Sequence, residues 1–366
     1  MATESPAPAK PASSGRIRCI DWLRGLAVFD MIMWHSAGLL KPEHNKNMLG
    51  TLAGLVAPSF LFAAGFAIAL VMIRASGDAA ARRRRATKSL QRILEVLVVA
   101  FLLRLVTRSG NDPHWLIRID ILSTIAWSLL AAFPLMYWGA SRPGLTSILF
   151  AILGLSFCAA WSYTPAGFAP AGCPPEQQWE KGWEGVWGNF IQPGSSDFAP
   201  IPWSGLVFLG AAAGGLASMG LVGVSLVFVF GTGVLFWCFA WHWTIGNMGE
   251  RLIFFGGGAL ALYALEREAN DKGWKLAHPP ISWLELVGTS ALTAYVAHIW
   301  LLYVGLPAWP FGSLSFSYWQ AWGAKLEWAQ YWIALLSLWV LTMGICWGWP
   351  RLSDAVKARW RPAAKG

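Results

Sequence analysis

The sequence predicts an all-α protein, a bundle of about ten transmembrane helices with the N- and C-termini both in the cytoplasm. Of its 366 residues, 56% are hydrophobic and only 13% are charged, whereas soluble domains contain about 25% charged residues. Ten apolar runs are close to the roughly 20 residues that a helix needs to cross a bilayer. The loops between these runs are alternately rich and poor in cations, as expected for a chain that crosses a membrane repeatedly.

The apolar runs place the helices in order along the chain. They lie at 22–40, 52–73, 90–107, 117–138, 144–161, 202–218, 221–240, 252–265, 283–306 and 329–349. Within them, the Gly210-Ala-Ala-Ala-Gly214 pattern and the Gly256–Gly258 triple allow helix backbones to approach closely. Neither pattern follows a strand, so we interpret both as packing positions and not as phosphate-binding loops.

Charge sets the predicted orientation. The 74–92 loop, RASGDAAARRRRATKSLQR, is densely basic, the 266–282 loop also carries cations, and both ends of the chain are basic. By the positive-inside rule these segments face the cytoplasm. The loops predicted outside are poor in cations and lie at 41–51, 108–116, 162–201, 241–251 and 307–328.

The same charges bear on partners and on domain organisation. The net charge of +9 is explained by orientation and by anionic membrane lipids, so we expect no nucleic-acid partner. Residues 1–15, rich in Pro, Ala and Ser, are expected to form a disordered cytoplasmic tail. Residues 16–350 form the predicted transmembrane domain, with 162–201 as a long outer loop, and 351–366 form a basic cytoplasmic tail.

The five cysteines show no spacing typical of a metal site or a disulfide framework. We therefore expect neither a bound metal nor structural disulfides.

The stretch from Arg16 to His35, RIRCIDWLRGLAVFDMIMWH, carries polar residues on one helical stripe. Arg24 and His35 differ by eleven positions, which is three turns with roughly 20° left over and about 16 Å of axial distance. Asp21 precedes Arg24 by three residues and shares the stripe. Ionisable side chains inside a membrane helix are costly to bury and therefore indicate function.

Arg24 and His35, separated by ten residues, resemble the arginine–histidine motif of integral-membrane acyltransferases that acylate extracytoplasmic glycans. Three further strings make the chain similar to the heparan-alpha-glucosaminide N-acetyltransferase catalytic-domain family, including its bacterial members. They are Asp-Trp-Leu-Arg-Gly at 21–25 with Ala-Pro-Ser-Phe-Leu-Phe-Ala-Ala-Gly-Phe at 57–66, Arg-Ile-Asp-Ile-Leu at 118–122 and Leu-Thr-Ala-Tyr-Val-Ala-His at 292–298.

The resemblance implies a multi-pass enzyme of the bacterial inner membrane. It would move an acetyl or similar acyl group from cytoplasmic acyl-CoA, a co-substrate, to a sugar hydroxyl or amine on the outer side. Membrane lipids are further expected partners, and a homodimer is one option for the oligomeric state.

Two histidines are candidates for the catalytic base. His35 lies among Met and Trp side chains, which disfavour the imidazolium and keep a neutral ring available as a base. It could alternatively accept the acyl group covalently. His44 lies in the loop KPEHNKNMLG, where the heparan-acetylating branch carries its catalytic histidine. We favour His35 as the base and His44 as a contact of the acceptor.

The remaining candidates are assigned by charge and depth. The Arg24 guanidinium suits a phosphate of coenzyme A, with Asp21 beside it. Asp120 could orient an imidazole, as a carboxylate does in a catalytic triad. Arg118 and His298, both in the outer half of the bundle, are assigned to acceptor binding.

Two other functions fit parts of the pattern. Intramembrane Asp, Arg and His also suit proton relays, so a transporter of a small solute or lipid-linked precursor is the alternative. A structural subunit of a polysaccharide-export assembly, with incidental histidines, is a third interpretation. Release of CoA thiol separates the enzyme from both.

Overall fold

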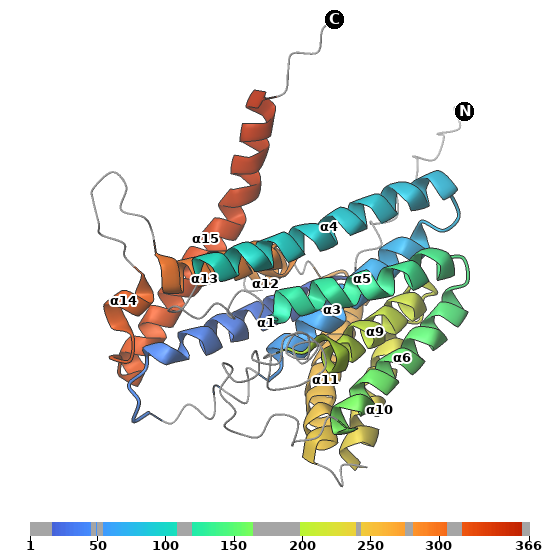
Figure 1. The fold of residues 1–366 in the computed structure, drawn as a ribbon, viewed down its shortest axis with the longest axis horizontal. Coiled ribbons are helices and arrows are strands. Elements are labelled where there is room, and N and C mark those ends of the chain that lie inside the picture. The colour runs from blue at the N-terminus through green and yellow to red at the C-terminus, as the bar shows by residue number, and fades with distance from the viewer. Residues whose placement is uncertain are drawn as a thin grey trace, which may run out of the picture.

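The computed structural model describes residues 17–44, 49, 54–107, 119–163, 198–238, 243–274, 281–305 and 317–360. Within these ranges the regular structure is helical (Figure 1). One isolated bridge, between Leu40 and Leu326, is the β contact of the described part. The predicted all-α class is therefore confirmed.

The helices follow the chain with short connections in several places. They are α1 (Arg18–Ser36), η1 (Ala37–Leu39), α3 (Val56–Arg74), α4 (Ala79–Val106), α5 (Ile121–Gly139), α6 (Pro143–Tyr163), α9 (Pro200–Ser218), α10 (Val222–Cys238), α11 (Trp243–Asp271), α12 (Ile281–Thr289), α13 (Ala291–Ile299), η3 (Trp300–Val304), α14 (Tyr318–Trp322) and α15 (Trp328–Trp360).

The predicted apolar runs all fall on helices, but two of them differ in form from the expectation. The short 252–265 run is the middle of α11, which has 29 residues. The 283–306 run is not one straight helix, because α12 and the segment from α13 through η3 are inclined by 85°. The predicted tails and most of the 162–201 loop lie outside the described residues.

Fewer helices qualify as membrane spans by length and composition than the sequence predicts. Among the described residues, α3, α5 and the first 28 residues of α15 qualify, and the bent α12–α13 pair would make a fourth. The apolar stretches of α6, α9 and α10 are shorter than 18 residues, and α1 is interrupted by charged residues. The count of ten spans and the cytoplasmic termini remain predictions.

Helices α3 and α9 pack at the centre of the bundle through small residues. A side chain added to Gly210 would overlap the backbone of Phe62, and one added to Gly214 would overlap that of Phe66. Gly65 approaches the backbone of Val207 in the same way. The predicted packing role of the Gly210–Gly214 pattern is confirmed, because only glycine admits this approach.

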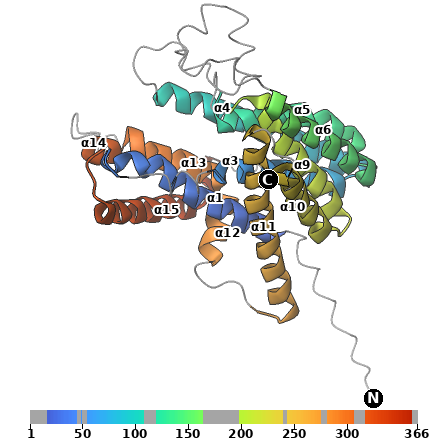
Figure 2. The same ribbon diagram turned by 90° about the horizontal axis from the view of Figure 1, so that it is seen from below.

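Helix α1 is fixed at its N-terminal end by two other helices. The Glu266 carboxylate of α11 accepts hydrogen bonds from the backbone N–H groups of Arg18 (3.0 Å) and Cys19 (2.9 Å). Gly25 and Gly288 allow α1 and α12 to touch backbone to backbone. Figure 2 shows α1 with α13, α14 and α15 on one side of the molecule, and α5, α6, α9 and α10 on the other.

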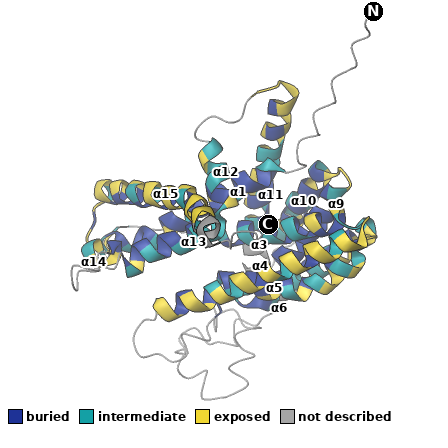
Figure 3. Cartoon of the chain, turned by 90° about the horizontal axis from the view of Figure 1, so that it is seen from above, coloured by how far each residue is buried: buried dark blue, intermediate teal, exposed yellow. Residues whose placement is uncertain are grey.

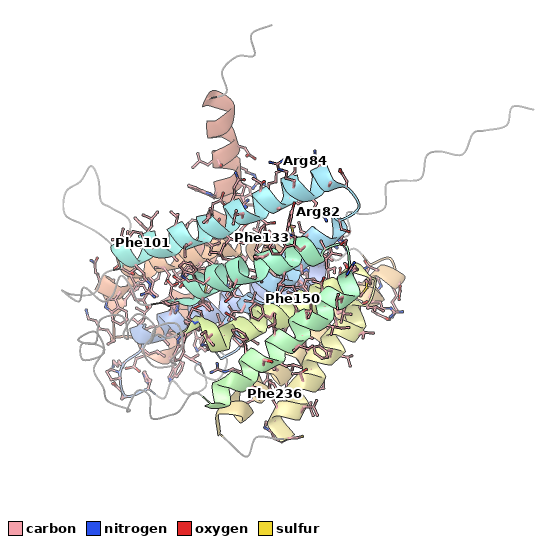
Figure 4. All side chains as sticks on the ribbon, turned by 45° about the vertical axis from the view of Figure 1, so that its right-hand side comes forward. Arg82, Arg84, Phe101, Phe133, Phe150 and Phe236 are labelled. Carbon is pink, nitrogen blue, oxygen red and sulfur yellow. The ribbon has the colours of Figure 1, made fainter. Side chains whose placement is uncertain are left out.

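Helix α4 changes character along its length. Its first half carries the basic run, in which Arg82 lies over the Tyr137 ring at 5.3 Å, and its second half is apolar. Figure 4 shows Arg82 and Arg84 at one end of the helix and Phe101 at the other. The outward faces of α4, α6 and α15 are largely exposed (Figure 3) and carry large apolar side chains, as lipid-facing surfaces do.

Candidate active site

The candidate site forms where α1 ends beside α13. His35 lies in the last turn of α1, and His298 is the penultimate residue of α13. The break at Ser290 makes this meeting possible: α12 packs along the first half of α1, and α13 then turns by 85° to pack against α15 and the end of α1. The bend therefore brings together two side chains separated by 263 positions in the sequence.

The two histidines are joined by a hydrogen bond. Nδ1 of His35 and Nε2 of His298 are 2.8 Å apart. The ring centres are 5.1 Å apart and the ring planes are inclined by 23°. Because the nitrogens are much closer than the ring centres, the rings meet edge to edge through these atoms. A separation of 2.8 Å lies within the range of a good hydrogen bond.

Two tyrosines frame this pair. The Tyr295 ring lies nearly perpendicular to both imidazoles, with centres 6.4 Å from His35 and 5.4 Å from His298. Tyr303 donates its hydroxyl proton to the backbone carbonyl of His35 over 3.2 Å. These contacts hold the end of α1 in place and leave the imidazole ring of His35 partly exposed, while His298 is fully buried.

Asp120 lies at the start of α5 and is held by two partners. Its carboxylate accepts from the Ser123 N–H at 2.8 Å, which caps the helix, and lies 3.5 Å from Nε of the buried Arg104. It was predicted to orient an imidazole. Instead it acts electrostatically, together with Arg104, on Tyr295, the neighbour of both histidines. Its link to the candidate site therefore runs through that tyrosine.

The predicted donor-binding pair is in contact. Nη1 of Arg24 lies 3.7 Å from Oδ1 of Asp21, and Nη2 donates to the Ala63 carbonyl of α3 over 2.7 Å. Both side chains lie near the opposite end of α1 from His35. The hydrogen bond to α3 fixes the direction of a guanidinium that would otherwise be free to move.

His44 lies in a different environment from His35. Its Nε2 is 2.8 Å from Oε2 of Glu327, and Lys41 contacts the other oxygen of the same carboxylate. These two hydrogen bonds lower the pKa of Glu327, with the bond from Lys41 as the larger cause, and the Glu327 bond raises the pKa of Lys41. The Trp328 ring lies 5.8 Å from that of His44. The structure thus gives each candidate base its own partner.

Sequence reasoning missed Glu327 and Tyr295. Glu327 lies in a loop that was read only for its lack of cations. Tyr295 could have been found from its spacing, because positions three apart share a helix face and Tyr295 precedes His298 by three. Arg118 lies outside the described residues, so its predicted contact with the acceptor stays a prediction.

Comparison with known proteins bears on the whole arrangement. The family described as heparan-alpha-glucosaminide N-acetyltransferase, catalytic, matches residues 16–225, more than half of the chain. No curated protein matches the sequence. The matched segment contains His35, His44, Arg24 and Asp120, whereas His298 lies beyond it.

Apolar helices suited to a membrane, an arginine and a histidine on one helix, and this match point the same way. The chain therefore belongs to the heparan-alpha-glucosaminide N-acetyltransferase catalytic family, and it is a membrane protein with an acyltransferase-type function.

Proposed function

We propose that this protein transfers an acetyl or similar acyl group from cytoplasmic acyl-CoA to a sugar hydroxyl or amine on the outer side of a bacterial inner membrane. The observation that carries the proposal is the His35–His298 pair at the end of α1, 2.8 Å apart, in a chain whose first 225 residues contain the family match. Members of this family are acetyltransferases, and acetyl-CoA is the expected donor.

His35 acts as the general base in the proposed reaction. Its imidazole takes the proton of the acceptor O–H or N–H while that oxygen or nitrogen attacks the thioester carbonyl carbon. The carbon–sulfur bond breaks, and the departing thiolate of CoA takes the proton back from the imidazolium. The partial exposure of His35 supports access by the acceptor.

Arg24 and Asp21 form the proposed donor contact. They lie about 16 Å from His35 along α1, a separation comparable with an extended pantetheine arm. A planar guanidinium suits the phosphates of coenzyme A, and Asp21 and the Ala63 carbonyl hold it in one orientation. The donor would thus enter from the cytoplasmic end and place its thioester near His35.

Acceptor binding is assigned to the outer side. His44 and Arg118 are the proposed contacts of the sugar, and Asp120 supports the site through Arg104 and Tyr295. The exposed Glu327 carboxylate beside His44 adds an acceptor of hydrogen bonds suited to sugar hydroxyls.

The test uses purified protein in liposomes with acetyl-CoA as donor and glucosamine or methyl glucoside as acceptor. Thiol release and transfer of labelled acetyl are measured together. We expect acceptor-dependent release in the wild type, and thiol release no faster than in empty liposomes with both acceptors would overturn the proposal. Counterflow of the sugar without thiol release would favour the transporter.

Three variants assign the roles. His35→Ala should lose roughly 10²–10⁴-fold in turnover, the usual contribution of a general base, with CoA affinity unchanged. His44→Ala should chiefly raise the KM of the sugar, and Arg24→Ala should weaken CoA binding. Near-normal turnover in His35→Ala beside an inactive His44→Ala would exchange the two histidine roles.

A further inference from the structure

The histidine pair continues into the backbone of α13. Nδ1 of His298 lies 3.0 Å from the carbonyl oxygen of Ala294, one turn earlier in the same helix. Three polar groups therefore form one line, from the Ala294 carbonyl through His298 to His35. In the described part of the chain, no hydrogen bond is made by Nε2 of His35.

The carbonyl at one end of this line determines where each proton lies. A carbonyl oxygen only accepts, so Nδ1 of His298 must carry a proton and donate it. A neutral imidazole has a single N–H, which leaves Nε2 of His298 as an acceptor. Nδ1 of His35 must then be the donor across the 2.8 Å contact. The one nitrogen left with a lone pair is Nε2 of His35.

Both rings are expected to be neutral at rest. No described carboxylate hydrogen-bonds either ring, and His298 is fully buried. A buried imidazolium without a counter-ion is costly. The assignment of protons above therefore holds for the resting enzyme.

We propose that His298 is a positioning residue that fixes His35 in the tautomer whose Nε2 is free to accept a proton from the acceptor. This inference rests on the proposed function and replaces the acceptor contact predicted for His298 from the sequence. Full burial of His298 keeps its ring from the acceptor, whereas His35 is partly exposed.

The same hydrogen bond serves the step that follows. When Nε2 of His35 takes the proton, the ring becomes an imidazolium and its Nδ1–H becomes a charged donor to His298. Hydrogen bonds from charged donors are roughly twice as strong as neutral ones. His298 thus also stabilises the charged form of His35, the part that a carboxylate performs in a catalytic triad.

Nitrogen NMR of histidine-labelled protein in detergent tests the tautomer directly, with the His35 resonances assigned by their loss in His35→Ala. The wild type should show a proton on Nδ1 and none on Nε2 of His35. His298→Phe removes the acceptor at similar ring volume, and His35 should then shift to a mixture of tautomers. His298→Gln keeps an acceptor oxygen, so its His35 signals should stay close to those of the wild type.

Kinetics provide the second readout. In His298→Phe we expect kcat to fall about 10–100-fold, the usual loss when a partner of a functional histidine is removed, with the KM for acetyl-CoA unchanged. His298→Gln should recover most of this loss. A merely structural role predicts instead that Gln fails as badly as Phe, and that result would contradict the proposal.

The outcomes separate this inference from the proposed function. A wild-type His35 protonated on Nε2 would overturn the relay even if acyl transfer is observed, and this measurement does not depend on whether His298→Phe folds. The expected tautomers without acyl transfer would instead overturn the proposed function and leave the hydrogen-bonded line intact.

Discussion

The Glu266 carboxylate makes a sharp stability prediction, because it ties α11 to the first turn of the helix that carries His35. Replacing Glu266 by Ala removes two hydrogen bonds, from the backbone N–H groups of Arg18 and Cys19. The side chain is only 8% exposed, so water cannot fully replace it. Leaving a buried donor unsatisfied costs about 1–3 kcal/mol.

The Cys19 N–H is buried and the Arg18 N–H is partly buried, so the two losses are unequal. We expect Glu266→Ala to lower the free energy of unfolding by roughly 2–4 kcal/mol, the sum of one full and one partial penalty. Glu266→Gln should lose about half as much, since its amide oxygen can accept one of the two bonds while its NH₂ group faces the other donor.

Unfolding free energies from SDS titration of the purified protein, followed by tryptophan fluorescence, measure the effect. Glu268→Ala is the matched control: it lies on the same helix, is exposed, and pairs with Lys272 at 2.7 Å. Exposed pairs of this kind contribute about 0.3–0.5 kcal/mol. If the Glu266→Ala loss stays within 0.5 kcal/mol of the control loss, the tether does not hold α1 as argued.

Three further predictions follow from the structure and the charge pattern. An alkaline phosphatase fusion at Glu180 should be active and one at the C-terminus inactive; the reverse result would invert the predicted topology. Gly288→Ala should cost about 1–3 kcal/mol by overpacking, whereas Gly344→Ala, with open space around its Cβ, should not destabilise; equal values would refute the close contact. Glu327→Gln should lower the raised pKa of Lys41 towards its ordinary value in an NMR titration, because the hydrogen bond to the carboxylate is its main cause; an unchanged pKa would contradict this.

The pH dependence of the Glu327 pair has a defined sign. The pKa of Glu327 is lowered in the folded protein, so its stabilisation is present above the unfolded pKa and is lost as pH falls through the folded value. The pKa of Lys41 is raised, so its contribution is present below the unfolded pKa and is lost as pH rises through the folded value. The pair is therefore weakened at both extremes, and both side chains are exposed enough for salt to screen it.

Helix positions were accessible from the sequence because apolarity and length suffice to recognise a membrane helix. The bend between α12 and α13 was not, because hydropathy records how apolar a run is and carries no information on its direction. The only local sign is the Gly288-Thr289-Ser290 string, in which small and polar residues interrupt an apolar run. Without the bend, α13 would not reach the end of α1.

The site itself was predicted in its members and missed in its connections. His35 and His298 were both expected in the outer halves of their helices, so depth in the bilayer placed them at a similar level. Their rotation about the helix axes depends on tertiary packing, which one sequence does not specify. Asp120 illustrates the same limit: its position before Ser123 marks a helix cap, but its ion pair with Arg104 requires α4 and α5 to be adjacent.

The two candidate bases differ in the chemistry of their partners. His44 is paired with an exposed carboxylate, which favours the charged ring and a role in binding. His35 is paired with a neutral, buried imidazole, which fixes a tautomer without adding a charge and so preserves a neutral base. Both partners, His298 and Glu327, lie beyond the segment that matches the family. The last third of the chain therefore supplies the groups that give each histidine its distinct character, and the assignment of the base depends on contacts outside the matched region.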